Sequence, residues 1–310
     1  MPRLPIRLAV AITAAALAGA VGCGTAAPAG HHASPGPVAT PSATRTDVPE
    51  PAVAPPAATR PAGRVVSLPG GPEGLAVDDR DGVLAVGVRS PDGVALVSAA
   101  TGRVRKLIHL AGAPRHLQVA GRGRLLLVPL EGQRRLVQLA LPGGAVVAST
   151  MVGHQPHDAA GAGSLVFVGN EYADTVSLVR GGKQIAVEPA PVQPGGVAAA
   201  RDGSVVVVVG VRGRQIKAYT GAGRPLGTAP AGVGPTHVRA GSGRLFYVAD
   251  TEGNAVLVYR VGAHGPRQVQ SVPTEPGRPY GIAVDSRRHL LYVTLTASNR
   301  LESFRISARG

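Results

Sequence analysis

Histidine, arginine and carboxylate side chains recur close behind prolines in this sequence. Arg115 and His116 follow one proline, and His157 and Asp158 follow a second. His237 stands two residues after a third proline. Imidazole can move protons or coordinate a metal ion, and guanidinium holds anions. These residue types allow three interpretations: a hydrolase with an imidazole acid or base, a histidine and carboxylate metal site, or ligand recognition without chemistry.

The prolines belong to a repeat of about 41 residues. Each repeat opens with proline, any residue, a glycine, histidine or aspartate, and then an apolar residue. Successive opening prolines are separated by 42, 42, 38, 41 and 44 residues, and they are Pro72, Pro114, Pro156, Pro194, Pro235 and Pro279. Within each repeat, short aliphatic runs alternate with turn residues, which predicts four strands and no amphipathic helix. The period and the strand pattern predict an all-β fold, a β-propeller.

Six openings predict six blades, with seven as the alternative. The last repeat ends after its third strand, so one strand is missing from the final blade. Residues Arg64 to Leu68 form a spare apolar run just before the first opening. Because a ring must remove its free strand edges, we expect this N-terminal strand to close the last blade.

In a propeller, the loops that enter the innermost strands and those between the second and third strands emerge on one face, around the central channel. Polar side chains in these loops are concentrated in the second and third repeats. The candidate ligand-binding residues are Glu73, Arg115, His116, Glu131, His157, Asp158, Glu171, His237 and Tyr280. Ligands spread over separate blades have no sequence spacing that could test a metal site, so we assign no metal and no cofactor.

Several catalytic motifs are absent from the sequence. It has no Gly-x-Ser-x-Gly elbow, no Walker loop and no His-Glu-x-x-His. We therefore assign no catalytic residue and favour binding over catalysis. The alternative is a metal-dependent hydrolase with its site at the channel mouth of blades 2 and 3.

The N-terminus has the layout of an export signal. Arg3 and Arg7 precede an apolar run from Leu8 to Val21, which is too short for a helix of about 20 residues that crosses a bilayer. The run is followed by Cys23, the only cysteine of the chain. Ala20 to Cys23 resembles the lipobox of bacterial lipoproteins, which implies a signal peptide over residues 1–22 and a lipid anchor on Cys23. The alternative is a freely secreted protein.

Residues 23–63 are predicted to be a disordered tether. Residues 24–63 contain nine prolines and eleven alanines but no aromatic residue, Leu or Ile, so they cannot bury enough apolar surface to fold. Residues 64–310 hold 28 basic against 16 acidic residues, which suits an anionic ligand or an envelope protein as partner. Aromatic residues make up only 3% of the chain, so nucleic acid is not expected. We expect a monomer.

Three segments carry a family resemblance. Leu291 to Thr294 reads LYVT, and the segments 165–170 and 245–250 are variants of it. The repeats over residues 64–310 resemble the YVTN-type β-propeller family, whose members are surface or periplasmic propellers with diverse ligands, some of them likened to lactonases. The resemblance implies the fold and leaves the chemistry open. We therefore expect a lipid-anchored extracytoplasmic β-propeller that binds a ligand or protein at the cell envelope, with a lactonase-like hydrolase as the alternative.

Overall fold

The computed structural model describes residues 51–60, 63–120 and 124–307. They lie in one compact unit, residues 45–310. The predicted signal peptide and Cys23 lie outside the described residues. Within the described ranges the one helix is a single 3-10 turn, η1 (Glu131–Gln133), and no helix is long and apolar enough to span a membrane.

The first three sheets have four antiparallel strands each. Blade 1 contains β1 (Gly71–Asp78), β2 (Val83–Arg89), β3 (Gly93–Ser98) and β4 (Val104–His109). Blade 2 contains β5 (Gln118–Ala120), β6 (Leu125–Leu130), β7 (Arg135–Ala140) and β8 (Ala145–Met151). Blade 3 contains β9 (Pro156–Ala162), β10 (Leu165–Asn170), β11 (Thr175–Arg180) and β12 (Lys183–Pro189).

The last three sheets continue the series, but the sixth has only three strands among the described residues. Blade 4 contains β13 (Pro194–Ala199), β14 (Val205–Gly210), β15 (Gln215–Thr220) and β16 (Pro225–Pro230). Blade 5 contains β17 (Pro235–Ala240), β18 (Leu245–Asp250), β19 (Ala255–Gly262) and β20 (Gly265–Pro273). Blade 6 contains β21 (Pro279–Asp285), β22 (Leu290–Leu295) and β23 (Arg300–Arg305).

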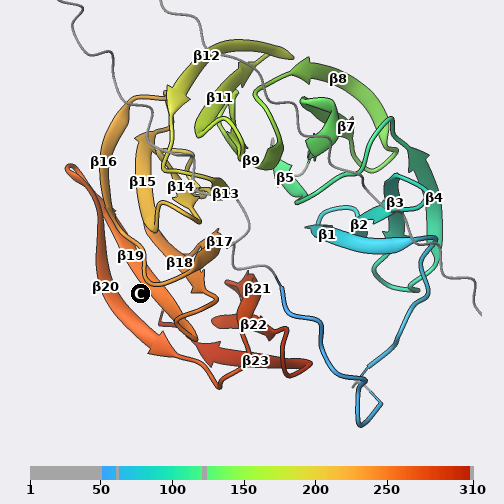
Figure 1. Ribbon diagram of the computed structural model, residues 1–310. Helices are drawn as coiled ribbons and strands as arrows, with labels where there is room; N and C mark the ends of the chain where they lie inside the picture. The colour runs from blue at the N-terminus through green and yellow to red at the C-terminus, as the bar shows by residue number, and fades with distance from the viewer. Residues whose placement is uncertain (1–50, 61–62, 121–123, 308–310) are drawn as a thin grey trace, which may run out of the picture. The chain divides into compact units, whose positions relative to one another are not determined.

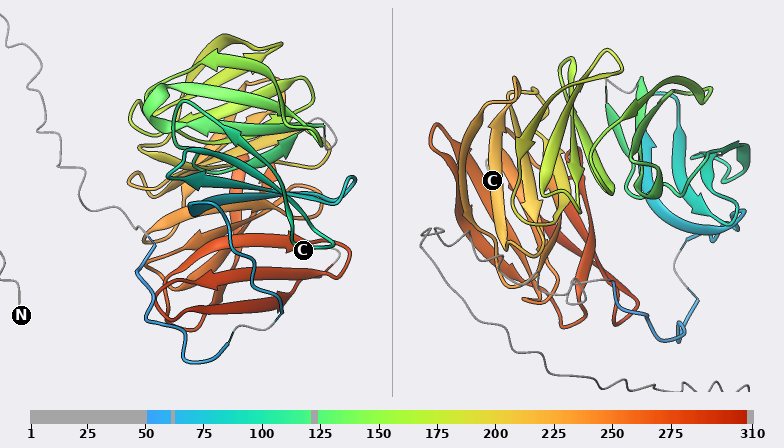
Figure 2. Two further views of the ribbon diagram at one scale, coloured as in Figure 1. Left: turned by 90° about the vertical axis from the view of Figure 1, so that its right-hand side faces the viewer. Right: turned by 45° about the horizontal axis from the view of Figure 1, so that its top comes forward.

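The six blades follow one another in chain order around a central axis, which confirms the predicted six-bladed β-propeller (Figure 1). The first strand of each blade lies innermost, and neighbouring first strands contact one another from β1 through β5, β9, β13 and β17 to β21. The side views show the strong twist of each sheet, as expected for antiparallel strands (Figure 2).

The hydrophobic core is divided among the interfaces between consecutive blades. Separate clusters join blades 1 and 2, 2 and 3, 3 and 4, 4 and 5, and 5 and 6. Alternating side chains of each strand supply the two faces, as in the wholly buried β14 (VVVVVG). A sixth cluster belongs to blade 1 alone. In the part of the chain that the structure describes, no such cluster joins blade 6 to blade 1.

The predicted closing strand is not found in the last blade. Residues 64–68 form no strand, and β23 is the outermost described strand of its sheet. Leu68 instead packs against the apolar face of blade 1 that includes Val86 and Val88, and the Arg64 guanidinium donates to the Ala100 carbonyl at 3.1 Å. The expectation was wrong because this face of blade 1 has no neighbouring blade to cover it, so Leu68 buries its side chain there.

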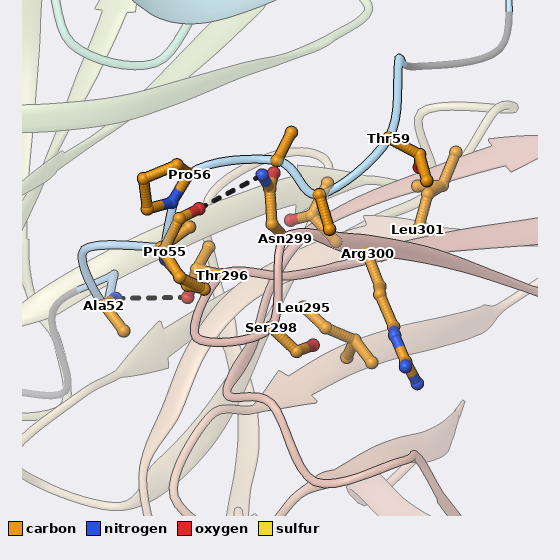
Figure 3. Close-up of a pocket in the computed structure, with 14 residues that line it drawn as sticks. Ala52, Pro55, Pro56, Thr59, Leu295, Thr296, Ser298, Asn299, Arg300 and Leu301 are labelled. Atoms are coloured by element: carbon orange, nitrogen blue, oxygen red, sulfur yellow. Dashed lines mark hydrogen bonds between the residues drawn. The ribbon is translucent and has the colours of Figure 1, made fainter.

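Residues 51–60 run beside the turn between β22 and β23 without regular secondary structure (Figure 3). The Ala52 amide donates to Thr296 Oγ1 at 3.1 Å, and the Asn299 amide donates to the Pro55 carbonyl at 3.4 Å. A cavity of about 690 Å³ lies between this segment and blade 6. The end of the predicted tether therefore contacts the propeller at blade 6.

Candidate functional site

Three blades supply histidines to the channel. His116 lies just before β5 in blade 2, His157 is the second residue of β9 in blade 3, and His237 is the third residue of β17 in blade 5. The backbone places them because β9 and β17 begin at the repeated proline, and the proline of blade 2, Pro114, forms an isolated bridge with Leu130 just before β5. The amide of His116 also donates to the carbonyl of His157 at 3.3 Å, which ties blade 2 to blade 3 at this point.

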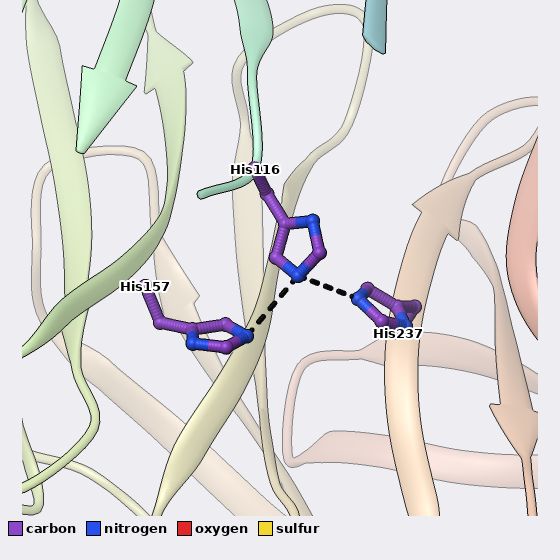
Figure 4. Close-up of side chains that lie close together, drawn as sticks. All are labelled: His116, His157 and His237. Atoms are coloured by element: carbon purple, nitrogen blue, oxygen red, sulfur yellow. Dashed lines mark hydrogen bonds between the residues drawn. The ribbon is translucent and has the colours of Figure 1, made fainter. Parts of the chain in front are cut away.

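The three imidazole rings converge on one another (Figure 4). Nε2 of His116 lies 3.1 Å from Nε2 of His157 and 2.8 Å from Nε2 of His237. One nitrogen of each ring lies within 4.8 Å of those of the other two. His157 and His237 are buried, and His116 is partly exposed. We call these three residues the histidine triad.

Two glutamates hold the far side of the His157 ring. Nδ1 of His157 lies 2.9 Å from Glu131 Oε1 and 3.2 Å from Glu171 Oε2. Both glutamates follow the second strand of their blades, in the loops that the sequence placed at the channel. Glu171 accepts a further hydrogen bond of 2.8 Å from the Gln193 side chain. The carboxylates therefore orient His157 so that its Nε2 faces the other two imidazoles.

The surroundings of the three histidines shift their pKa values in different directions. Burial by itself would lower the pKa of His157, but hydrogen bonds to Glu131 and Glu171 outweigh it and raise the pKa to about 9. Burial, and then the neighbouring His237, holds the pKa of His116 well below its ordinary value. Burial, and then the charge of Arg239, does the same for His237. At neutral pH, His116 and His237 are therefore neutral and can act as ligands through a lone pair.

Two arginines and two glutamates form an ion-pair network beside the triad. Glu73 lies 2.9 Å from Arg89 Nε and 3.3 Å from Arg115 Nη1. Glu131 lies 3.5 Å from Arg89 and 3.7 Å from Arg115. Because Glu131 also contacts His157, this network fixes the carboxylate that orients the triad.

Asp158 has a different environment from its neighbour His157. Its carboxylate is fully buried and accepts hydrogen bonds from Gln118 Nε2 at 2.9 Å and from the amides of Ala159 and Val197 at 2.8 and 3.0 Å. Arg239 lies 3.8 Å away. Consecutive residues of a strand point to opposite faces, which explains why Asp158 joins blades 2, 3 and 4 instead of the triad.

A cavity of about 400 Å³ reaches the triad from the side of blades 1 and 6. His116 and His237 line it, and the Tyr280 ring contacts the His237 ring edge-on with 4.4 Å between centroids. Its other lining residues are Glu73, Gly74, Leu75, Arg239, Gly281, Ile282, Ala283, Tyr292, Thr294 and Leu301. Two members of the triad are thus accessible from this cavity.

The structure brings most of the candidate residues together. Glu73, Arg115, Glu131, Glu171 and Tyr280 all lie around the triad, whereas Asp158 belongs to the packing between blades. Sequence reasoning expected a site at blades 2 and 3 and did not single out Gln118, Gln193 or Arg239. Gln193 stands immediately before the opening proline of its repeat, which is the one sequence signal that could have found it.

Comparisons with known proteins support the architecture. The structure is similar to a catalytically inactive histidine-to-alanine variant of virginiamycin B lyase from Staphylococcus aureus with quinupristin, with a TM-score of 0.63 and 13% identity over 75% of this chain and 79% of that chain. It is also similar to hydrazine synthase from Kuenenia stuttgartiensis, with a TM-score of 0.60 and 16% identity over 76% and 77% of the two chains. A chain of a nidogen/laminin complex matches with a TM-score of 0.53 and 15% identity over 65% and 80%.

The chain has the β-propeller fold. At such low identities these similarities establish the fold alone. No family model and no curated protein sequence matches the chain. The chemistry of the site therefore has to be argued from its own residues.

Proposed function

We propose that the protein binds a divalent transition-metal ion through Nε2 of His116, His157 and His237. The observation that carries the proposal is the convergence of these three nitrogens from three different blades. Imidazole nitrogens are preferred ligands of zinc, copper, iron and nickel. A tetrahedral zinc site with Zn–N bonds of about 2.0–2.1 Å places its ligand nitrogens roughly 3.3 Å apart. The distances from His116 Nε2 to the other two Nε2 atoms, 3.1 and 2.8 Å, are close to that value.

Hydrogen bonding alone does not account for both short contacts of Nε2 of His116. A ring nitrogen offers either one N–H or one lone pair, so Nε2 of His116 can make one good hydrogen bond. It nevertheless lies within 3.1 Å of two other Nε2 atoms, those of His157 and His237. A cation at the centre would accept all three lone pairs at once, which supports a metal site over a proton-shared cluster.

The surroundings of His157 resemble the second sphere of metal sites. A ligand histidine commonly directs its other ring nitrogen at a carboxylate, which fixes the ring and strengthens it as a donor. Glu131 and Glu171 lie in that position, and Arg89 and Arg115 fix Glu131. On binding, the metal would replace the proton on Nε2 of His157.

Three protein ligands would leave a fourth coordination position for a ligand. Catalytic zinc sites keep such a position open, whereas structural sites are closed by four protein ligands. The cavity beside His116 and His237 leads to the triad, and Arg239 and Tyr280 line it. We therefore propose a ligand with an anionic or carbonyl oxygen. The same open position supports the second candidate function, metal-dependent hydrolysis of a lactone-like substrate.

We further propose that this module is attached to the outer face of the cell membrane. The apolar run before Cys23 and the resemblance of residues 20–23 to a lipobox support export and lipid attachment. The repeat segments support membership of the YVTN-type propellers. An anionic ligand or an envelope protein would be the partner of this basic chain, which would act as a monomer.

Metal analysis tests the proposed site. The full chain, loaded with Zn²⁺ and dialysed, should retain one ion per chain, while His116→Ala and His237→Ala should each retain less than about a tenth of that. His264→Ala is the matched control because His264 is exposed on the turn between β19 and β20. Glu131→Gln should weaken zinc affinity by about 10–100-fold. Metal-free wild-type protein, or equal zinc in His116→Ala with an unchanged circular dichroism spectrum, would overturn the proposal.

A further inference from the structure

The third strand of blade 6 is exposed where its counterparts are covered. In blades 1 to 5 the third strand lies between the second and the fourth strands of its sheet. β23 pairs with β22 on one side, and no strand among residues 51–60, 63–120 and 124–307 pairs with its other side. Residues of β3 are buried throughout, whereas β23 has no fully buried residue.

The backbone register shows which groups face this open edge. The amide of Ile306 donates to the carbonyl of His289, so residue 306 faces β22. Hydrogen-bonded positions alternate along an antiparallel strand, and the backbone groups of Leu301, Ser303 and Arg305 therefore face away from β22. At the equivalent positions of blade 5, Val256 and Val258 pair with β20. The outer edge of β23 thus offers a row of donors and acceptors for another strand.

An apolar cavity of about 390 Å³ lies beside the same strand. Phe304 and Ile306 reach it from β23 and the residue after it, and Val272 lines it from β20. The remaining lining residues are Tyr247, Val256, Val258, Gln270, Leu291, Arg305 and Ser307. A strand added along β23 would carry every second side chain toward this cavity.

The positive charge at the ends of β23 favours an acidic partner strand. Arg300 and Arg305 stand at the two ends of β23, and both are exposed. Glu302, the acidic residue of the strand, accepts a hydrogen bond of 3.0 Å from the amide of Glu275. A second copy of β23 would bring two more exposed arginines to the same edge, and the repulsion of these like charges is unfavourable. The edge therefore suits a strand of another protein with acidic residues at its ends.

We propose that the outer edge of β23 binds an extended segment of a partner polypeptide by strand addition. The segment completes blade 6 through backbone hydrogen bonds to Leu301, Ser303 and Arg305. Its apolar side chains enter the cavity beside Phe304, and acidic residues pair with Arg300 and Arg305. Backbone bonding gives affinity in such complexes, and the side-chain pocket gives specificity. This surface shares Leu301 with the cavity beside the histidine triad, but it does not depend on the metal.

A synthetic peptide tests the edge directly. The probe is a fluorescent peptide, Glu-Val-Thr-Val-Thr-Val-Glu, titrated with the full chain and followed by anisotropy. Ser303→Pro removes one outward N–H without touching the bonds to β22, a position where edge strands accept proline. Ser303→Pro should weaken binding by at least about tenfold, whereas Ser303→Ala, which keeps the N–H, should bind like the wild type.

Two further variants test the cavity and the charges. Val272→Lys should weaken binding by about tenfold because it places a charge in the apolar cavity. Replacing the two glutamates of the probe with lysines should also weaken it by about tenfold. Absence of binding to the wild type, or equal binding to Ser303→Pro and Ser303→Ala, would overturn the proposal. So would a dimer in sedimentation velocity that Ser303→Pro dissociates, because the edge would then belong to a second copy of this chain.

Discussion

Tyr259 in blade 5 and Phe304 in blade 6 occupy the same position in the repeat, the fifth residue of the third strand, but in different surroundings. Tyr259 is fully buried, and its hydroxyl donates to the carbonyl of Pro230, the last residue of the preceding blade's fourth strand, at 2.7 Å. Tyr219 in blade 4 makes the same contact with Pro189. Phe304 is only partly buried and has no hydroxyl.

The difference shows what a complete blade contributes. A third strand that lies between two others buries its side chains against the neighbouring blade, and a tyrosine there can tie its ring to the previous blade. In blade 6 no described fourth strand covers β23, so the equivalent ring packs at the margin of the core between blades 5 and 6 and also lines a cavity. The same repeat therefore produces rigid packing in blades 4 and 5 and a binding edge in blade 6.

Removing the aromatic ring at this repeat position should have the largest effect on stability, and the loss should be greater in blade 5 than in blade 6. Tyr259→Ala is expected to lower the free energy of unfolding by about 3–5 kcal/mol, because it leaves a cavity in a packed core. Phe304→Ala should cost only about 1–2 kcal/mol, because its ring is partly solvated. Urea denaturation followed by circular dichroism measures both. Equal losses would mean that blade 6 is as tightly packed as blade 5.

Alkaline titration should distinguish Tyr259 from ordinary tyrosines. Burial, and then the charge of Asp250, raises the pKa of Tyr259 to about 12. Because this lies above the unfolded value of about 10, the stabilising contribution is complete below about pH 10 and is lost as the pH rises through about 12. The difference in tyrosinate absorbance between wild type and Tyr259→Phe reports this residue alone. An ionisation near the unfolded value would contradict the tight packing of blade 5.

Exchanging the hydroxyl should have the smallest effect. Tyr259→Phe should cost about 1 kcal/mol, since it removes one buried hydrogen bond to the Pro230 carbonyl. Phe304→Tyr should gain about 0.5–1 kcal/mol, because Pro273 ends β20 as Pro230 ends β16 and offers the matching carbonyl. Urea denaturation of the two variants measures both changes, with Tyr219→Phe as the reference for an intact blade. Destabilisation by Phe304→Tyr would show that the sixth blade does not follow the geometry of the others.

Much of the fold could be predicted because the repeat is local. The six opening prolines and the alternating apolar runs specify strands and turns within about 41 residues, and the structure confirms six blades. The closing strand could not be predicted in the same way. Residues Arg64 to Leu68 have a suitable composition for a strand, but their placement depends on which apolar face is left uncovered, and that is a property of the assembled ring.

The candidate site was predictable in composition but not in geometry. His116, His157 and His237 stand out because each follows an opening proline, yet they are 41 and 80 residues apart in the chain. No spacing rule connects residues on blades 2, 3 and 5. Gln193 had only its place before an opening proline as a signal and Arg239 had none, because their roles depend on contacts with Glu171 and Asp158 from other blades.

The sequence by itself determined the β-propeller, the number of its blades and the set of polar side chains at the inner strands, because local periodicity and turn residues encode them. Only the tertiary structure decided that three imidazole nitrogens meet and that no strand in the described part of the chain pairs with the outer edge of β23. Both features depend on the order in which the blades pack around the channel and on which surfaces find a neighbour. Such long-range packing leaves no periodic signal in the chain.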